Sequence, residues 1–283
     1  MVLAIMYLIS WKKKNISVKM LVKAVIAQFL IAVILVKVPA GRYVVSRVSD
    51  AVTSVINCGQ DGLSFVFGSL ADSTAAAGSV FAIQVLGNIV FLSALVSFLY
   101  YIGILGFVVK WIGKAVGKLM GTSEVESFVA VANMFLGQTD SPMPVAMVAL
   151  VAAVNKLLGV CGISLQQVFS YVFAPFGFFL GLDPSEILLE GNLLGSKLVL
   201  NEFVAFQQLG SMISSMDYRT GMICAISLCG FANFSSLGIC VSGIAVLCPE
   251  KKSTLARLVF KAMLGGVAVS LISAMTVGLV TLC

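Results

Sequence analysis

The sequence predicts an all-α, polytopic membrane protein with transmembrane and interfacial helices. Apolar residues make up 60% of its 283 residues, charged residues only 11%, and the mean hydropathy is +1.08. A soluble domain carries about 25% charged residues, so this chain lacks the side chains for a polar surface. The apolar runs, such as residues 83–99 and 259–282, are also continuous, whereas strands of a membrane barrel alternate apolar with polar residues.

The net charge of +6 could indicate a nucleic-acid-binding protein, but the positive residues gather at the ends of apolar runs. Lysine and arginine beside membrane spans mark the cytoplasmic side. We therefore interpret them as topology signals and expect a multi-pass protein of the plasma membrane, which is the inner membrane in a Gram-negative cell. The two clusters are Lys12, Lys13, Lys14, Lys19 and Lys23, and then Lys251, Lys252 and Arg257.

Catalysis is not expected. The chain has no histidine, which removes both the usual general base and the usual metal ligand. Its seven cysteines form no CxxC pair, and most lie inside apolar runs, where cysteine behaves as a small hydrophobic residue. A recognisable pair of nucleophile and base is also missing from the sequence. We expect no enzyme activity and no organic cofactor.

The N-terminal half is expected to alternate membrane spans with surface helices. Apolar runs at 21–38 and 80–101 are long enough to cross a bilayer. Residues 44–70 keep apolar residues at helical spacing with polar residues between them, which is typical of an amphipathic interfacial helix. Gly59 and Gly62 are expected to interrupt it. A second interfacial helix is expected around Lys110, Lys114 and Lys118, which recur every four residues.

The C-terminal half contains further apolar runs, and several carry breaks. Pro175 and Gly177 are expected to break one of them, because proline removes a helical hydrogen bond. A glycine followed by Asn233, Ser235 and Ser236 interrupts another, which indicates a discontinuous helix. The runs span residues 143–160, 165–182, 187–209, 222–247 and 259–282.

A first polar cluster lies at residues 133–142, between two apolar runs. Gly137 and Pro142 would break the helix, and Gln138, Thr139 and Asp140 then offer hydrogen-bond donors and acceptors at the break. Backbone groups freed by such a break can hold ions or polar substrate atoms. The alternative is an ordinary loop at the membrane surface.

A second and a third polar cluster follow. Glu202 lies among apolar residues, where an ionisable group is costly and marks function by default. It could instead face lipid headgroups or pair with Lys197, although five residues is a poor helical pairing distance. Residues 229–238 form the third cluster, for which helix packing by small polar residues is the alternative. Their pattern echoes residues 132–137, and matched broken helices are typical of transporters with internal repeats.

These clusters resemble the signature segments of the concentrative nucleoside transporters. The segments are GQTD at 137–140, NEFVA at 201–205 and GFANFSS at 230–236. Residues 62–70 and 91–101 are similar to the family as well, and all the segments occur in the family's order. The resemblance extends from the N-terminus to the C-terminus of the chain.

The resemblance implies a trimer whose protomers couple nucleoside uptake to a sodium or proton gradient by alternating access. It adds two re-entrant helical hairpins to the predicted fold class and divides each protomer into a scaffold and a moving transport domain. On this basis four parts are expected. They are N-terminal scaffold helices at 1–43; interfacial helices, a span and the first hairpin at 44–142; scaffold or linker helices at 143–182; and the second hairpin with C-terminal helices at 183–283.

The resemblance also implies roles for individual residues. A carboxylate such as Glu202 is a suitable acceptor for ribose hydroxyls, and sodium, a hard cation, suits oxygen ligands. The expected roles are Gln138 and Thr139 at the nucleobase; Asp140 in the pocket; Glu202, Asn233 and Ser236 at the ribose; Phe231 lining the pocket; and Asn133 with the carbonyl of Leu136 in a partial sodium site.

The chain departs from the family pattern in two places. Asp140 stands where the family usually has glutamate, which shortens the side chain by one methylene. After Pro142, a block of helices that contributes further sodium ligands and part of the pocket is missing. The alternative to a working symporter is therefore a non-transporting or degenerate relative that binds nucleoside or only assembles with other chains.

Overall fold

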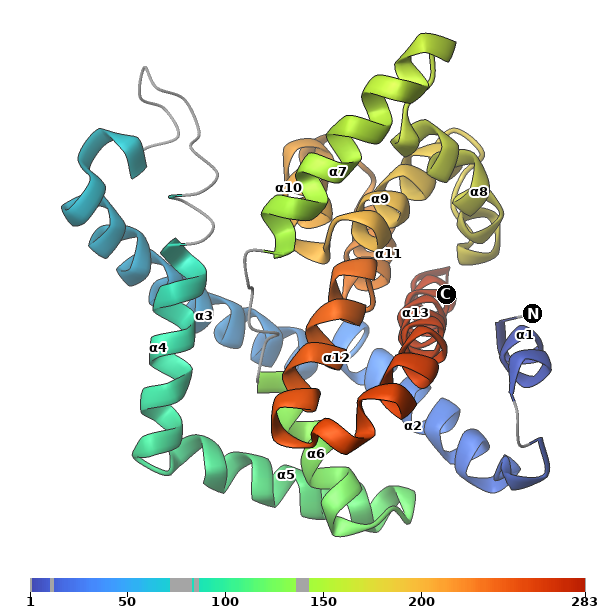
Figure 1. Ribbon diagram of the computed structural model, residues 1–283. Coiled ribbons are helices and arrows are strands. Elements are labelled where there is room, and N and C mark those ends of the chain that lie inside the picture. Colours follow the sequence, from blue (N-terminus) through green and yellow to red (C-terminus); the bar gives the residue numbers. More distant parts are fainter. Residues whose placement is uncertain (1, 11–12, 72–82, 84–86, 136–142, 283) are drawn as a thin grey trace. The chain divides into compact units, whose positions relative to one another are not determined.

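The computed structural model describes residues 2–10, 13–71, 83, 87–135 and 143–282, and every regular element within these ranges is a helix (Figure 1). This confirms the all-α class. The chain divides into two compact units. The N-terminal unit holds Val18–Val25 and Lys37–Gly137, and the C-terminal unit holds Met1–Ser17, Ile26–Val36 and Gln138–Cys283.

Helices long and apolar enough to cross a membrane lie near both ends of the described chain. They are α2 (Val18–Val36) and the segment Pro249–Leu282, which contains α13 (Lys252–Leu282). Both match spans predicted from the sequence. Two further pairs of helices pass the same test together but are sharply bent. They are Val90–Tyr101 with Ile104–Met120, bent by 78°, and Val151–Cys161 with Leu165–Leu180, bent by 89°.

In the N-terminal unit, α3 (Pro39–Phe67) is one unbroken helix of 29 residues. The predicted interruption at Gly59 and Gly62 is therefore wrong. Gly59 instead allows close packing, because a Cβ there would lie 2.5 Å from Cδ1 of Phe91 in α4 (Gly87–Tyr101). Glycine in this helix thus serves the contact with α4, and helical hydrogen bonding continues through it.

The rest of this unit is α5 (Ile104–Met120) and α6 (Glu124–Phe135). The chain turns between α4 and α5 at Gly103, whose φ of 83° favours glycine. The predicted helix around Lys110, Lys114 and Lys118 is α5, and all three side chains are exposed. Ser123 and Glu126 begin α6 with reciprocal hydrogen bonds, a capping box.

In the C-terminal unit, α8 (Leu165–Leu180) packs along α9 (Ile187–Val199). Gly191 and Gly195 allow this approach: a Cβ on Gly191 would lie 2.3 Å from the carbonyl oxygen of Ser170, and one on Gly195 would lie 2.4 Å from Cβ of Phe169. The break that was predicted at Pro175 and Gly177, in the apolar run 165–182, is wrong. Pro175 lies inside α8, which continues to Leu180.

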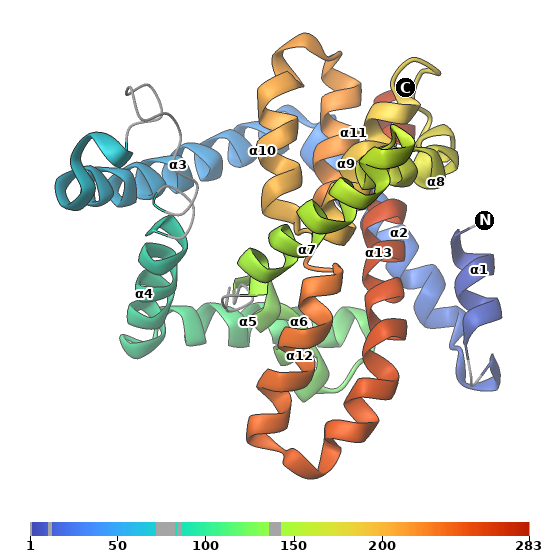
Figure 2. The same cartoon turned by 45° about the horizontal axis from the view of Figure 1, so that its top comes forward.

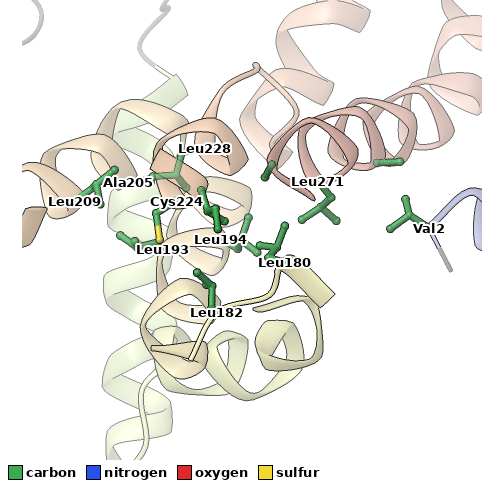
Figure 3. Close-up of a cluster of buried hydrophobic side chains, with 13 residues drawn as sticks. Val2, Leu180, Leu182, Leu193, Leu194, Ala205, Leu209, Cys224, Leu228 and Leu271 are labelled. Carbon is green, nitrogen blue, oxygen red and sulfur yellow. The ribbon is translucent and has the colours of Figure 1, made fainter. Parts of the chain in front are cut away.

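The core of the C-terminal unit gathers around α9 (Figure 3). Leu193 and Leu194 of α9 lie with Ala205 of α10 (Glu202–Met212) and with Cys224 and Leu228 of α11 (Tyr218–Leu228). Figure 2 shows α12 (Phe234–Leu247) and α13 as two arms that meet at the turn Pro249–Lys251. This unit also contains α1 (Val2–Ile9), α7 (Met143–Leu158) and the part of α2 at Ile26–Val36.

Candidate functional site

The candidate site forms where two helices of the C-terminal unit are interrupted. One break lies between α9 and α10, and the other lies between α11 and α12, where the sequence predicted a discontinuous helix. An asparagine begins the second helix at each break. The Asn201 side chain accepts from the backbone N–H of Val204 at 2.9 Å, and the Asn233 side chain accepts from that of Ser236 at 2.7 Å. Asparagine is a preferred N-cap, because its oxygen satisfies a backbone donor that the helix leaves unpaired.

Gly230 makes the second break possible. Its φ of 103° lies in a region that residues with a Cβ avoid, so the chain can turn there out of α11. A Cβ at this position would also lie 3.1 Å from Oγ of Ser270 in α13. The turn therefore needs glycine both for its backbone angle and for the close contact with α13.

The structure brings Glu202, Asn233 and Ser236 together. Asn233 Nδ2 donates to Glu202 Oε2 at 2.9 Å, and Ser236 Oγ lies 2.7 Å from Asn233 Oδ1. The Ser236 hydroxyl is also within hydrogen-bond distance of the Phe231 carbonyl. We call Glu202, Asn233, Ser236 and Phe231 the break cluster.

The break cluster combines buried and accessible groups. Asn233 and Ser236 are buried, Glu202 is half-buried, and Phe231 is 40% exposed. A carboxylate only accepts hydrogen bonds, whereas amide and hydroxyl groups both donate and accept. These polar groups suit a ligand that presents hydroxyl groups.

The other predicted site residues cannot be placed beside this cluster. Leu136, Gln138, Thr139 and Asp140 lie outside the described residues. Asn133 lies in α6 of the N-terminal unit. Their roles at the nucleobase and at sodium therefore remain predictions from the family resemblance.

Lys197 is a buried residue whose role the sequence did not reveal. The sequence suggested at most a weak pairing with Glu202. In the structure Lys197 is 1% exposed, and its Nζ donates to the carbonyls of Ser227 and Cys229 at 2.8 and 3.1 Å and to Ser270 Oγ at 3.2 Å. A lysine inside an apolar run, with no acidic residue four positions away, was the signal that could have indicated such a buried partner.

Glu190 is the second buried ionisable residue of α9. It is fully buried, and within the part of the chain that the structure describes neither of its carboxyl oxygens has a hydrogen-bond partner. Cys224 and Ser227 of α11 lie next to its carboxyl group. No role was predicted for Glu190 from the sequence.

Known proteins similar to this chain include nucleoside transporters. A family model described as "Na+ dependent nucleoside transporter C-terminus" matches residues 141–278, and one described as "Na+ dependent nucleoside transporter N-terminus" matches residues 1–70. The nucleoside permease NupC of Helicobacter pylori is 26% identical over 98% of this chain and 96% of its own length. An uncharacterised transporter of Haemophilus influenzae is 29% identical over 98% of this chain and 95% of its own length.

Solved structures agree with the sequence matches. The transporter CNTnw in an inward-facing substrate-bound state has a TM-score of 0.90 and 26% identity, covering 100% of this chain and 96% of that one. A CNTnw variant in an outward-facing state has a TM-score of 0.90 and 25% identity, covering 99% of this chain and 96% of that one.

The chain is shorter than these relatives because of internal gaps. Its alignment with NupC of Helicobacter pylori runs over 400 positions, whereas the chain has 283 residues, so at least 117 positions of that alignment have no residue of this chain opposite them. The two family models together match well over half of the chain, in the family's order. The chain therefore belongs to the sodium-dependent concentrative nucleoside transporter family, as a truncated, all-helical and multi-pass membrane member that is not an enzyme.

Proposed function

We propose that this chain takes up nucleosides by alternating access, with a cation gradient, sodium or proton, as the driving force. The observation that carries the proposal is the break cluster, in which Glu202, Asn233 and Ser236 meet through hydrogen bonds of 2.9 and 2.7 Å. These groups lie at two helix breaks of the C-terminal unit. Relatives of the chain include a mouse protein named sodium/nucleoside cotransporter 1, which is 23% identical to it.

Each residue has a definite task in this proposal. The Glu202 carboxylate accepts hydrogen bonds from the ribose hydroxyls, because it can only accept. Asn233 holds that carboxylate in place through its Nδ2, and the Ser236 hydroxyl fixes the Asn233 side chain in turn. The exposed ring of Phe231 packs against the flat face of the base.

The remaining proposed residues belong to the first polar cluster. Gln138 and Thr139 contact the nucleobase, Asp140 contributes to the pocket, and Asn133 with the carbonyl of Leu136 forms part of the sodium site. We also propose that the chain works as a homotrimer in the plasma membrane, with the moving parts divided as the family resemblance implies.

The internal gap favours a second candidate function, a relative that binds nucleosides without moving them. At least 117 aligned positions of Helicobacter pylori NupC have no counterpart here, and the family resemblance assigns sodium ligands to the block of helices missing after Pro142. Such a chain would keep the ribose contacts of the break cluster while losing the coupling to an ion.

Uptake into proteoliposomes separates the two functions. Purified chain is reconstituted, and accumulation of radiolabelled uridine is followed with an inward sodium gradient, with an inward proton gradient and with neither. Accumulation that depends on a gradient is the result expected of the symporter, and the effective gradient identifies the ion. Saturable binding to the same vesicles without accumulation would contradict the symporter and support the second candidate.

A further inference from the structure

The buried ammonium group of Lys197 takes no part in the proposed nucleoside contacts, yet it is fully bonded. A lysine ammonium has three N–H donors, and here three oxygens accept from it: the carbonyls of Ser227 and Cys229 and the hydroxyl of Ser270. Oxygen atoms arranged around one centre in this way are also what a hard metal cation seeks. Lys197 thus places a cation inside a shell of oxygen ligands.

This shell lies at the C-terminal end of α11. The last carbonyls of a helix have no partner within the helix, and the helix dipole makes that end negative. Ser227 lies in the last turn of α11, and Cys229 is its C-cap residue. The Lys197 side chain reaches them from α9, so it supplies both the hydrogen bonds and the positive charge that the interrupted helix lacks.

A short covalent path links this cation to the break cluster. Cys229, whose carbonyl accepts from both Lys197 and Ser270, is followed by the left-handed turn at Gly230. Phe231 comes next, and its carbonyl accepts from Ser236. The direction of the Cys229 peptide therefore sets the direction in which the chain leaves α11 and arrives at Asn233.

We propose that Lys197 is a positioning residue for nucleoside binding. It acts as a tethered cation that holds the break between α11 and α12 in the conformation in which Asn233 and Ser236 meet Glu202. It does so without touching the nucleoside. The inference rests on the nucleoside site proposed above and adds to it a residue that prepares the site before the ligand arrives.

Lys197→Met tests the role, since methionine keeps much of the side-chain length and removes the charge and the donors. Uridine affinity is measured by equilibrium binding, and stability is measured by thermal unfolding of the same detergent-purified protein. We expect the affinity to fall by about tenfold or more, because the carbonyls of Ser227 and Cys229 both lose the bond from Lys197 and Cys229 keeps the one from Ser270. An affinity equal to that of the unsubstituted chain would overturn the inference.

Leu194→Ala is the matched control, because Leu194 is a buried residue of the same helix whose side chain belongs to the hydrophobic core and carries no charge or hydrogen-bond donor. It should lower the unfolding temperature while the folded protein keeps its uridine affinity. If Leu194→Ala weakens binding as much as Lys197→Met does, Lys197 is a packing residue and the inference fails.

If Lys197→Met does not fold, Ser270→Ala tests the inference in its place. It removes one of the three acceptors and the Ser270 bond to Cys229, and leaves both carbonyls with Lys197. A smaller loss of affinity, of about threefold to tenfold, is expected; no loss would contradict the inference. If the unsubstituted chain itself fails to bind uridine, the proposed function fails first, which distinguishes the two failures.

Discussion

Asn233 serves the helix and the site with different atoms of one side chain. Its Oδ1 caps α12 through the backbone N–H of Ser236, and its Nδ2 donates to Glu202. The sequence could predict that Asn233 and Glu202 matter, because both are polar residues in apolar runs. It could not predict that Asn233 caps α12, because this depends on the residue at which α12 begins.

Asn233→Asp separates these two roles. Aspartate caps a helix as well as asparagine does, so the stability of α12 should be kept. The donor to Glu202 is lost, however, and two carboxylates then face each other. We expect uridine binding to weaken by about tenfold or more, measured by equilibrium binding.

Asp217→Asn is the matched control for this substitution. Asp217 caps α11 by accepting from the backbone N–H of Arg219, and it lies exposed at the other end of that helix. The exchange of aspartate and asparagine there should leave uridine binding unchanged. Equal binding by Asn233→Asp and the unsubstituted chain would show that the Glu202 contact does not serve the ligand.

A substitution of Glu190 is expected to stabilise the protein, because a buried polar group without a hydrogen bond lowers the stability of the folded state. Both its carboxyl oxygens lack such a partner among the described residues. Glu190→Leu should therefore raise the free energy of unfolding, by about 1 kcal/mol or more, measured as a higher unfolding temperature in detergent.

Glu186→Leu should have the opposite effect and is the control. Glu186 Oε2 accepts from Thr220 Oγ1 at 2.7 Å, and Thr220 is buried, so the substitution leaves a buried donor unpaired. A lower unfolding temperature for Glu190→Leu than for the unsubstituted chain would mean that the Glu190 carboxyl group has a stabilising partner.

At the scale of elements, the sequence predicted the helices better than their breaks. The apolar runs 21–38 and 259–282 coincide with helices that are long and apolar enough to cross a membrane, and the run 80–101 lies partly outside the described residues. Gly59 and Pro175 were expected to interrupt helices, and neither does. Glycine and proline weaken a helix by amounts that packing can offset, and the contact between Gly59 and Phe91 is visible only in three dimensions.

The contact between α8 and α9 depends on two glycines spaced four residues apart. Closely packed membrane helices use small residues in this way. Gly191→Ala would place a methyl group 2.3 Å from the backbone oxygen of Ser170, so the helices must separate. We expect a loss of about 1–3 kcal/mol in the free energy of unfolding, measured as a lower unfolding temperature in detergent.

Gly210→Ala provides the comparison within the same unit. Gly210 lies inside α10, and a Cβ there would meet nothing within 4 Å. Alanine is the better helix former, so this variant should be as stable as the unsubstituted chain or more stable. If both variants lose the same stability, glycine at position 191 is not needed for helix packing.

At the scale of the whole molecule, the family motifs predicted more about the chain than its composition did. Composition and charge predicted a helical membrane protein, and the motif order predicted the family to which the chain belongs. The members of the break cluster lie in two of the segments that resemble the family's, 201–205 and 230–236, and their role at the nucleoside stays a prediction. The buried ammonium of Lys197 was not predicted, because two of its three partners are backbone carbonyls, which every sequence contains.

Recognition of the sugar of a nucleoside by the break cluster is the central prediction. Equilibrium binding of radiolabelled uridine to the purified full chain and to Glu202→Gln tests it, with free uracil as competitor. Saturable binding by the unsubstituted chain, weakened by about tenfold or more in Glu202→Gln and little affected by uracil, is the predicted result. Equal binding by the two proteins, or no saturable binding by the unsubstituted chain, would contradict the claim.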